Sequence, residues 1–219
     1  MSVLIELAKE TAGYGGRPVL HGIDLVIRAG ERVAVMGRSG AGKTTLLNLL
    51  YARMAERVAL VPQGSALVKT LSVFHNVYMG RLDRYPTWYN IRTLIWPARR
   101  VVGEVAAVLD LVGLRDLLFA RAGELSGGQQ QRASVARALY NGRPILIGDE
   151  PVSALDRVQG GEILGRLAAR HETVIVALHD IFLALDHTDR IVVLDSGRIA
   201  LDAPSNTLTA ADLIPYYGG

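Results

Sequence analysis

The sequence of 219 residues contains no cysteine, so disulfide bonds and thiol chemistry are excluded. It has no run of about twenty apolar residues, which argues against a membrane-spanning helix. Its first residues show no basic stretch followed by an apolar one, and we therefore expect no secretion signal. Lysine is rare, since Lys9, Lys43 and Lys69 are the only three. A lysine at a motif position is therefore informative.

The charge balance is mild, with a formal net charge of +3 at pH 7. The basic excess consists of arginine and forms no concentrated basic tail. We attribute it to overall composition and expect no nucleic-acid binding. Apolar residues make up 50% of the chain, which is enough to bury a full core in one compact unit that could carry a lobe.

One of the three lysines lies in a glycine-rich segment, residues 37–44, which matches the phosphate-binding pattern G-x-x-x-x-G-K-[ST]. An apolar run at 32–36 precedes it and a good helix former at 45–50 follows, as the pattern requires. Inward-pointing N–H groups and the positive end of the helix dipole favour bound phosphate. Lys43 can then reach the β- and γ-phosphates, and the Thr44 hydroxyl can complete a Mg²⁺ shell. We expect a nucleoside triphosphate site.

Two adjacent carboxylates, Asp149 and Glu150, end the apolar stretch at 145–148. Adjacent side chains on a strand point to opposite faces, but the chain turns at a strand end, so both can face one site. A carboxylate there can hold Mg²⁺ or its water shell opposite Thr44. We expect Asp149 to bind the metal and Glu150 to orient and polarise the attacking water.

A second helix start carries Ser126, Gly127, Gly128 and Gln129, which is another anion-binding arrangement by the same helix-terminus argument. One nucleotide cannot easily touch two such sites in one small domain. We therefore expect a head-to-tail dimer in which the Ser126 segment of each subunit covers the γ-phosphate bound by the other.

Strands that alternate with helices predict an α/β fold with a parallel sheet and an antiparallel N-terminal element. We expect strands at 3–7, 20–27, 32–36, 57–61, 145–148, 173–178, 190–195 and 198–202. We expect helices at 45–50, 71–80, 102–112, from the Ser126 segment to about 140, and near 156–170. The stretch between 80 and 102 is expected to be irregular, and residues 14–18 are expected to form a turn.

With these motifs in place, the chain resembles the nucleotide-binding subunits of ABC transporters over nearly its whole length. The resemblance implies a P-loop NTPase of the ABC ATPase type, with residues 1–219 as one domain and a helical lobe at about 67–141 inserted in a RecA-like core. It implies ATP and Mg²⁺ as cofactors, and a subunit-contact loop at 153–156. It also implies that Tyr14 stacks on adenine, that Gln63 senses Mg²⁺ and the membrane partner, and that His179 is a switch near the γ-phosphate.

The resemblance thus gives a complete set of expected site residues. The expected nucleotide-binding residues are Tyr14, Gly37, Ser39, Gly40, Gly42, Lys43, Thr44, Thr45, Gln63, Ser126, Gly127, Gly128, Gln129 and Asp149. The expected catalytic residues are Glu150, His179, Lys43 and Gln63, and the expected metal ligands are Thr44, Gln63 and Asp149. Three of these have a plain structural alternative: a turn aromatic at Tyr14, a solvated loop amide at Gln63, and a helix cap at His179.

One feature departs from the family pattern. Only twenty residues separate Lys43 from Gln63, about half of the family's usual interval. The missing part matches the antiparallel arm beside the base. We therefore expect a reduced N-terminal β element and a less fully held adenine. The groups that carry the chemistry are all kept, so we still expect hydrolysis.

The segment from Leu67 to Arg100 corresponds, by resemblance, to the lobe that docks a membrane subunit, and it is rich in aromatics. An exposed apolar groove there would indicate a protein interface, whereas a lobe core packed on itself is the structural alternative, and both can hold at once. Residues 71–82, followed by 86–89, are similar to the matching stretch of phosphonate importer ATPases. This likeness is the basis for expecting import of phosphonate or a related oxyanion.

The resemblance implies an ATP-hydrolysing subunit on the cytoplasmic face of a bacterial-type membrane. Its expected partners are two transmembrane permease subunits, a solute-binding protein, and a second copy or similar ATPase that sandwiches two ATP molecules. The alternative that stays open is a soluble accessory ATPase of a phosphonate-degrading complex, because such proteins keep the same motifs. A regulator that only binds nucleotide is disfavoured by the presence of Glu150.

Overall fold

The computed structural model describes residues 2–217. The chain divides into two compact units, which are described separately below. The first unit contains the chain up to Gln63 and again from Arg143 onward, and the second unit runs from Gly64 to Gly142. Among the described residues, the helices are too short or too polar for any of them to cross a membrane.

A six-stranded sheet forms the centre of the first unit, in the order β4-β5-β6-β3-β7-β8. Its strands are β3 (Arg32–Met36), β4 (Val58–Val61), β5 (Ile145–Asp149), β6 (Thr173–Ala177), β7 (Arg190–Asp195) and β8 (Arg198–Pro204). The first five pair in parallel, and β8 is antiparallel at the edge. Continuous apolar runs in β5 and β6 are buried along their whole length, as expected for strands covered on both faces.

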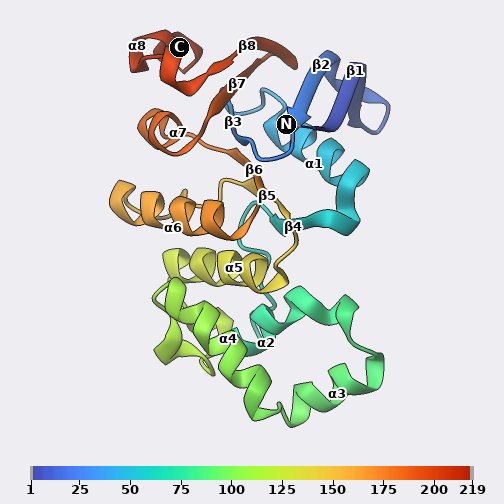
Figure 1. Cartoon of the computed structure of the whole chain (residues 1–219), viewed down its shortest axis with the longest axis vertical. Helices are drawn as coiled ribbons and strands as arrows, with labels where there is room; N and C mark the ends of the chain where they lie inside the picture. The colour runs from blue at the N-terminus through green and yellow to red at the C-terminus, as the bar shows by residue number, and fades with distance from the viewer. Residues whose placement is uncertain (1, 218–219) are drawn as a thin grey trace. The chain divides into compact units, whose positions relative to one another are not determined.

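Helices cover both faces of this sheet, α1 (Lys43–Met54) on one side and α6 (Arg157–Arg170) with α7 (Ile181–His187) on the other (Figure 1). This division follows from the strand order, because right-handed crossovers that run in opposite directions along a sheet place their helices on opposite faces. The chain then continues from β8 through a 3₁₀ helix (Ser205–Thr207) into α8 (Ala210–Leu213) and a last 3₁₀ turn (Ile214–Tyr216).

A separate antiparallel pair, β1 (Val3–Tyr14) and β2 (Arg17–Arg28), forms the N-terminal element. Alternate apolar residues of this pair, among them Leu7, Leu20 and Leu25, are buried in one core with residues of α1 and the central sheet. A single 3₁₀ turn (Ala55–Arg57) connects α1 to β4, and no strand lies between them. The expectation of a reduced antiparallel element is met in this sense: the sheet has two strands.

The parallel strands place several predicted site residues at one edge of the sheet. Residue 37 follows β3, Gln63 follows β4, Asp149 ends β5, and His179 comes two residues after β6. These strands are parallel neighbours, so their carboxyl ends share an edge. In open α/β sheets that edge, near the point where the strand order reverses, is where ligands bind.

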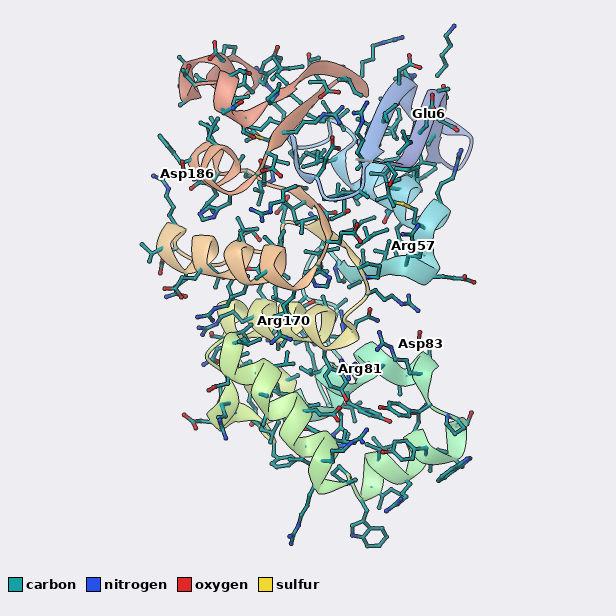
Figure 2. The ribbon with its side chains drawn as sticks, in the orientation of Figure 1. Glu6, Arg57, Arg81, Asp83, Arg170 and Asp186 are labelled. Carbon is teal, nitrogen blue, oxygen red and sulfur yellow. The ribbon has the colours of Figure 1, made fainter. Side chains whose placement is uncertain are left out.

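The second unit is helical. Its elements are α2 (Val73–Tyr78), a 3₁₀ helix (Met79–Arg84), α3 (Thr87–Ile95), α4 (Arg99–Leu111), 3₁₀ turns at Arg115–Leu117 and Ala122–Glu124, and α5 (Gly127–Asn141). Arg81, labelled in Figure 2, connects three of them. Its guanidinium lies 4.1 Å from the centre of the Tyr140 ring, donates to the Tyr140 carbonyl, and pairs with Glu104 at 3.5 Å.

Two expectations about local structure are wrong. The stretch from 80 to 102 is not irregular, because it contains α3 and the start of α4. Pro86 precedes α3 with extended backbone (φ −65°, ψ 154°), so it starts the helix instead of breaking it. The first two strands are also much longer than 3–7 and 20–27, because the turn between them is confined to Gly15 and Gly16, both with positive φ.

Candidate functional site

The glycine-rich segment forms a tight loop between β3 and α1. Gly37 has φ +134°, and a Cβ there would lie 2.2 Å from the Leu194 carbonyl oxygen. Gly42, the residue before α1, has φ +104°, and a Cβ there would meet the Leu20 side chain at 2.8 Å. Both positions need glycine for conformation and for space. The loop geometry is therefore restricted by the packing of β7 and β2 around it.

Lys43 is the first residue of α1, and only 6% of its surface is exposed. Its Nζ donates to the carbonyl oxygens of Gly37 at 2.6 Å and Arg38 at 3.0 Å, so the side chain folds back over the loop. Burial lowers the pKa of Lys43, against the opposing pull of Glu150 and Asp149. The ammonium group thus lies among the loop carbonyls, where phosphate oxygens would be better partners.

Asp149 and Thr44 form the expected pair. The Thr44 hydroxyl donates to Asp149 Oδ2 at 2.7 Å, across 105 positions of sequence. The other carboxylate oxygen, Oδ1, is buried and has no hydrogen-bond partner among the described residues. Buried polar atoms without a partner are rare in proteins, and this one adjoins a hydroxyl. A carboxylate beside a hydroxyl is a set of oxygen ligands that suits Mg²⁺. The residues present therefore fit this ion.

Within the described residues, no cluster of three or more His, Cys, Asp or Glu side chains could enclose a metal ion. Proteins usually bind Mg²⁺ without such a cluster. The ion keeps several waters and takes one or two protein ligands together with the phosphates of a substrate.

Glu150 faces the same site because the chain turns at the end of β5. Its φ is +55°, and its N–H donates to the Ala177 carbonyl at 3.2 Å. Glu150 Oε1 lies 2.5 Å from His179 Nε2, and both side chains are partly exposed. His179 is not the cap of α7, since the Asp180 carboxylate accepts the N–H groups of residues 182 and 183. The cap alternative for His179 is therefore excluded.

These groups line one cavity of about 390 Å³. Its lining residues are Val19, Ser39, Gly40, Gly42, Lys43, Thr44, Thr45, Gln63, Glu150 and His179. Nine of the ten are predicted site residues. Val19, on β2, was not predicted, and an aliphatic residue in a strand carries no sequence signal for such a position. The cavity brings together the phosphate loop, a strand-end carboxylate and a histidine.

Gly37 and Asp149, whose contacts are given above, are not part of this lining, and neither are Tyr14 and the Ser126 segment. Tyr14 ends β1, is 58% exposed, and accepts a hydrogen bond from Asn48 Nδ2 at 3.1 Å. Ser126 belongs to the second unit, where it caps α5. The Ser126 hydroxyl accepts from the Gln129 N–H at 3.3 Å, and Gln129 Oε1 accepts from the Ser126 N–H at 2.9 Å. Ser126 and Gly127 are exposed at the surface, as a segment must be if it is to meet another molecule.

The loop at 153–156 is also at the surface. Ser153 donates to the Glu150 carbonyl at 3.2 Å, and the Asp156 carboxylate caps α6 by accepting from the Gln159 N–H at 2.9 Å. The loop is thus attached directly to the turn that carries Glu150. A partner that touches this loop would contact the residues that hold the carboxylate.

A second hollow lies in the helical unit. It has a volume of about 250 Å³ and an almost entirely apolar wall formed by Leu71, His75, Tyr78, Met79, Leu82, Thr87, Asn90, Ile91 and Leu94. Beside it, α3 leaves Trp88 66% exposed and Ile91 56% exposed. The aromatics of this segment divide, because Phe74 and Tyr78 are buried in the unit's own core. Both expectations for the segment are therefore met: a packed core and an exposed apolar groove.

The fold and the loop geometry define a P-loop nucleoside triphosphatase. The ABC transporter family profile matches residues 20–153, and the chain belongs to this family. It is an ATPase of the ABC class, the kind of subunit that powers a membrane transporter.

Particular relatives are more informative. The chain is 37% identical to the phosphonates import ATP-binding protein PhnC 2 of Pseudomonas aeruginosa, over 92% of this chain and 86% of that protein. It is 35% identical to the phosphonates import ATP-binding protein PhnC of Trichormus variabilis, over 92% and 93% of the two chains. Among solved structures, it is similar to the dimeric post-hydrolysis state of the ATP-binding cassette MJ0796 bound to ADP and Pi, with a TM-score of 0.73. The two sequences are 26% identical, and the match covers 91% of this chain and 98% of that chain.

Proposed function

We propose that this chain hydrolyses ATP to drive the import of phosphonate or a related oxyanion. The observation that carries the ATPase part is the single cavity shared by Lys43, Thr44, Glu150 and His179. The cargo is inferred from the names of the relatives, which are phosphonate import proteins matched over most of this chain. The same names favour transport over an accessory role in a phosphonate-degrading complex.

The roles of the cavity residues follow from their contacts. Lys43 would leave the carbonyls of Gly37 and Arg38 and donate to the β- and γ-phosphates, which are stronger acceptors. Glu150 would accept a proton from the attacking water and so orient it toward the γ-phosphorus. His179, 2.5 Å from the Glu150 carboxylate, would hold that carboxylate in position and contact the γ-phosphate.

We assign Mg²⁺ to Thr44, Asp149 and Gln63. The unpartnered Oδ1 of Asp149 and the adjoining Thr44 hydroxyl support this assignment, as does the place of Gln63 in the cavity lining. When bound, the ion would neutralise charge on the phosphate oxygens. In the same proposal, Tyr14 stacks on adenine, for which its exposed ring is available.

Exposed surfaces support the proposed partners. Two copies, or one copy and a similar ATPase, would clamp two ATP molecules so that the Ser126–Gln129 segment of each, which is exposed at Ser126 and Gly127, covers the other's γ-phosphate. The two units described above would act as one ATPase domain, with the second as the lobe. The apolar groove beside α3 would take a short helix of a permease subunit, which is how amphipathic helices bind. The chain would then lie on the cytoplasmic face of the membrane, with two permease subunits and a solute-binding protein completing the importer.

Growth of a deletion strain on phosphonate as the sole phosphorus source tests this proposal. The wild-type chain is expected to restore growth. The Ile91→Asp variant is expected to restore none, because a carboxylate in the apolar groove would block docking of the permease, although the purified variant should bind ATP normally. Val3→Asp is the matched control, since Val3 is an equally exposed aliphatic residue at 57% against 56% for Ile91.

Two outcomes would contradict the proposal. Undiminished growth of the deletion strain on phosphonate, with no redundant importer present, would rule out phosphonate as the cargo. Full complementation by Ile91→Asp would show that the permease does not dock in this groove. Growth on inorganic phosphate controls for general viability.

A further inference from the structure

The last described residue of the chain contacts the phosphate loop. Tyr217 follows the 3₁₀ turn after α8, far from the loop in sequence. Its hydroxyl accepts a hydrogen bond from the Gly37 N–H at 3.0 Å, across 180 positions. The same hydroxyl donates to the Leu178 carbonyl at 3.3 Å. Tyr217 therefore joins the carboxyl ends of β3 and β6, which are neighbours in the central sheet but lie far from Tyr217 and from each other in sequence.

Gly37 is a sensitive place for such a contact. It is the first residue of the loop, is buried, and cannot carry a side chain because of the Leu194 carbonyl. Its carbonyl accepts from Lys43 Nζ, and its N–H is held by Tyr217. Both polar groups of this residue are thus fixed, one by the lysine expected to bind phosphate and the other by Tyr217. A buried N–H without a partner is unfavourable, so removal of the hydroxyl would reorient this part of the loop.

The other end of the bridge is the residue before His179. Leu178 donates its N–H to the Val35 carbonyl at 3.2 Å and offers its own carbonyl to Tyr217. The next residue, His179, lies 2.5 Å from Glu150. The Tyr217 hydroxyl is therefore one hydrogen bond from the loop that holds Lys43 and one from the segment that positions His179.

The surroundings of Tyr217 suit a permanent contact. Its ring is partly buried, and burial raises the pKa of the phenol, so the hydroxyl keeps the proton that it donates to Leu178. A second tie lies beside it, a long contact of 3.5 Å from an Arg38 Nη to the Pro215 carbonyl. Tyr217 is not among the residues that line the nucleotide cavity, so it would act through the backbone of Gly37 and Leu178.

We propose that Tyr217 is a positioning residue for ATP hydrolysis, which connects the start of the phosphate loop to the histidine switch through one hydroxyl. This proposal rests on ATP hydrolysis by the cavity described above. Through this bridge, movement of the loop on nucleotide binding would be transmitted to the backbone that carries His179, and thus to Glu150.

Tyr217→Phe tests the proposal because it removes only the bridging oxygen. We expect kcat for ATP hydrolysis to fall about three- to tenfold, the change that corresponds to loss of one or two net hydrogen bonds. We expect KM for ATP to change less than twofold. Tyr216→Phe is the matched control, since the neighbouring tyrosine is also partly buried and its hydroxyl should be dispensable. In a His179→Ala background, the further effect of Tyr217→Phe on kcat should largely disappear, because the two residues act together.

A purely structural role would give a different pattern: a lower Tm with unchanged kcat well below that Tm, or effects of Tyr217→Phe and His179→Ala that simply add. Either result would overturn the proposal. Hydrogen exchange of the Gly37 amide gives a readout independent of activity, and it should be at least about tenfold faster in Tyr217→Phe. Unchanged exchange would also overturn it. Failure of the wild-type chain to hydrolyse ATP would instead contradict the proposed function, and the exchange measurement would still test the bridge.

Discussion

Glutamine in place of Glu150 is expected to lower kcat for ATP hydrolysis by about 10²- to 10⁴-fold, the usual contribution of a positioned general base. Glu150→Gln keeps the shape of the side chain and its place at the φ +55° turn, but it cannot accept the proton of the attacking water. ATP binding should persist, because Lys43 and the loop are untouched. The variant should therefore accumulate as an ATP-bound dimer, since closure is favoured by bound ATP and only hydrolysis reverses it.

Steady-state phosphate release and the amount of nucleotide retained after gel filtration measure these two effects. Glu172→Gln is a suitable control, because Glu172 is an exposed carboxylate between α6 and β6 and lies outside the cavity lining. Hydrolysis by Glu150→Gln at the wild-type rate would show that the assigned role is wrong. The neighbouring His179 could not then be explained as the group that holds this carboxylate.

Replacement of Lys43 by alanine should have the second largest effect, an increase in the Kd for ATP. A hydrogen bond to a charged group contributes about 1.5–3 kcal/mol, which corresponds to about ten- to more than hundredfold in affinity. Lys43→Ala also leaves the Gly37 and Arg38 carbonyls without their Nζ partner, so the loop should lose order even without nucleotide. Equilibrium binding of a fluorescent ATP analogue measures the affinity.

The scarcity of lysine makes the control for this variant simple. Lys9→Ala removes one of the two other lysines, at an exposed position in β1. Its affinity for ATP should equal that of the wild type. An unchanged Kd in Lys43→Ala would contradict the phosphate-binding role of the loop lysine. Because burial lowers the pKa of Lys43, its ammonium group loses its charge at a lower pH than that of an ordinary lysine. As the pH is raised, the affinity of the wild type for ATP should therefore begin to fall at that lower pH.

The residues around the loop were predictable because local sequence fixes them. The apolar run before Gly37 forms β3, and the helix former after it forms α1. Likewise, the apolar stretch before Asp149 forms β5, and the turn at Glu150 brings this carboxylate into the cavity that Thr44, the partner of Asp149, also lines. Each of these depends on short-range pattern and on the shared carboxyl edge of parallel strands.

In the helical unit, the stretch from 80 to 102 is hard to predict because α3 is short and the local signals conflict. This stretch contains Pro86 and is expected to be irregular, although the backbone of Pro86 begins α3. In the first unit, α7 has only seven residues and none of the expected helices covers it, although Asp180 caps it. Short helices depend on tertiary packing more than on propensity, so sequence pattern alone gives them little support.

Other features have no local signal at all. The hydroxyl of Tyr217 meets Gly37 across 180 positions, and the unpartnered Oδ1 of Asp149 becomes visible only when its surroundings are known. Contacts of this kind depend on how segments far apart in the chain pack together, which no single stretch of sequence specifies. The roles of the site residues remain predictions for the same reason, since they concern ATP and a second chain.

The most direct test of the account is the solution mass, by sedimentation, of Glu150→Gln with ATP and Mg²⁺, compared with the same chain carrying Ser126→Asp. Aspartate caps a helix as well as serine does, so α5 should be kept, but its charge would repel a γ-phosphate presented by another subunit. We predict a dimer with two ATP molecules for Glu150→Gln and a monomer when Ser126→Asp is added, with the neutral Ser126→Asn retaining more dimer. A Ser126→Asp chain that dimerises as tightly as its parent would contradict the claim that this segment covers the neighbour's nucleotide.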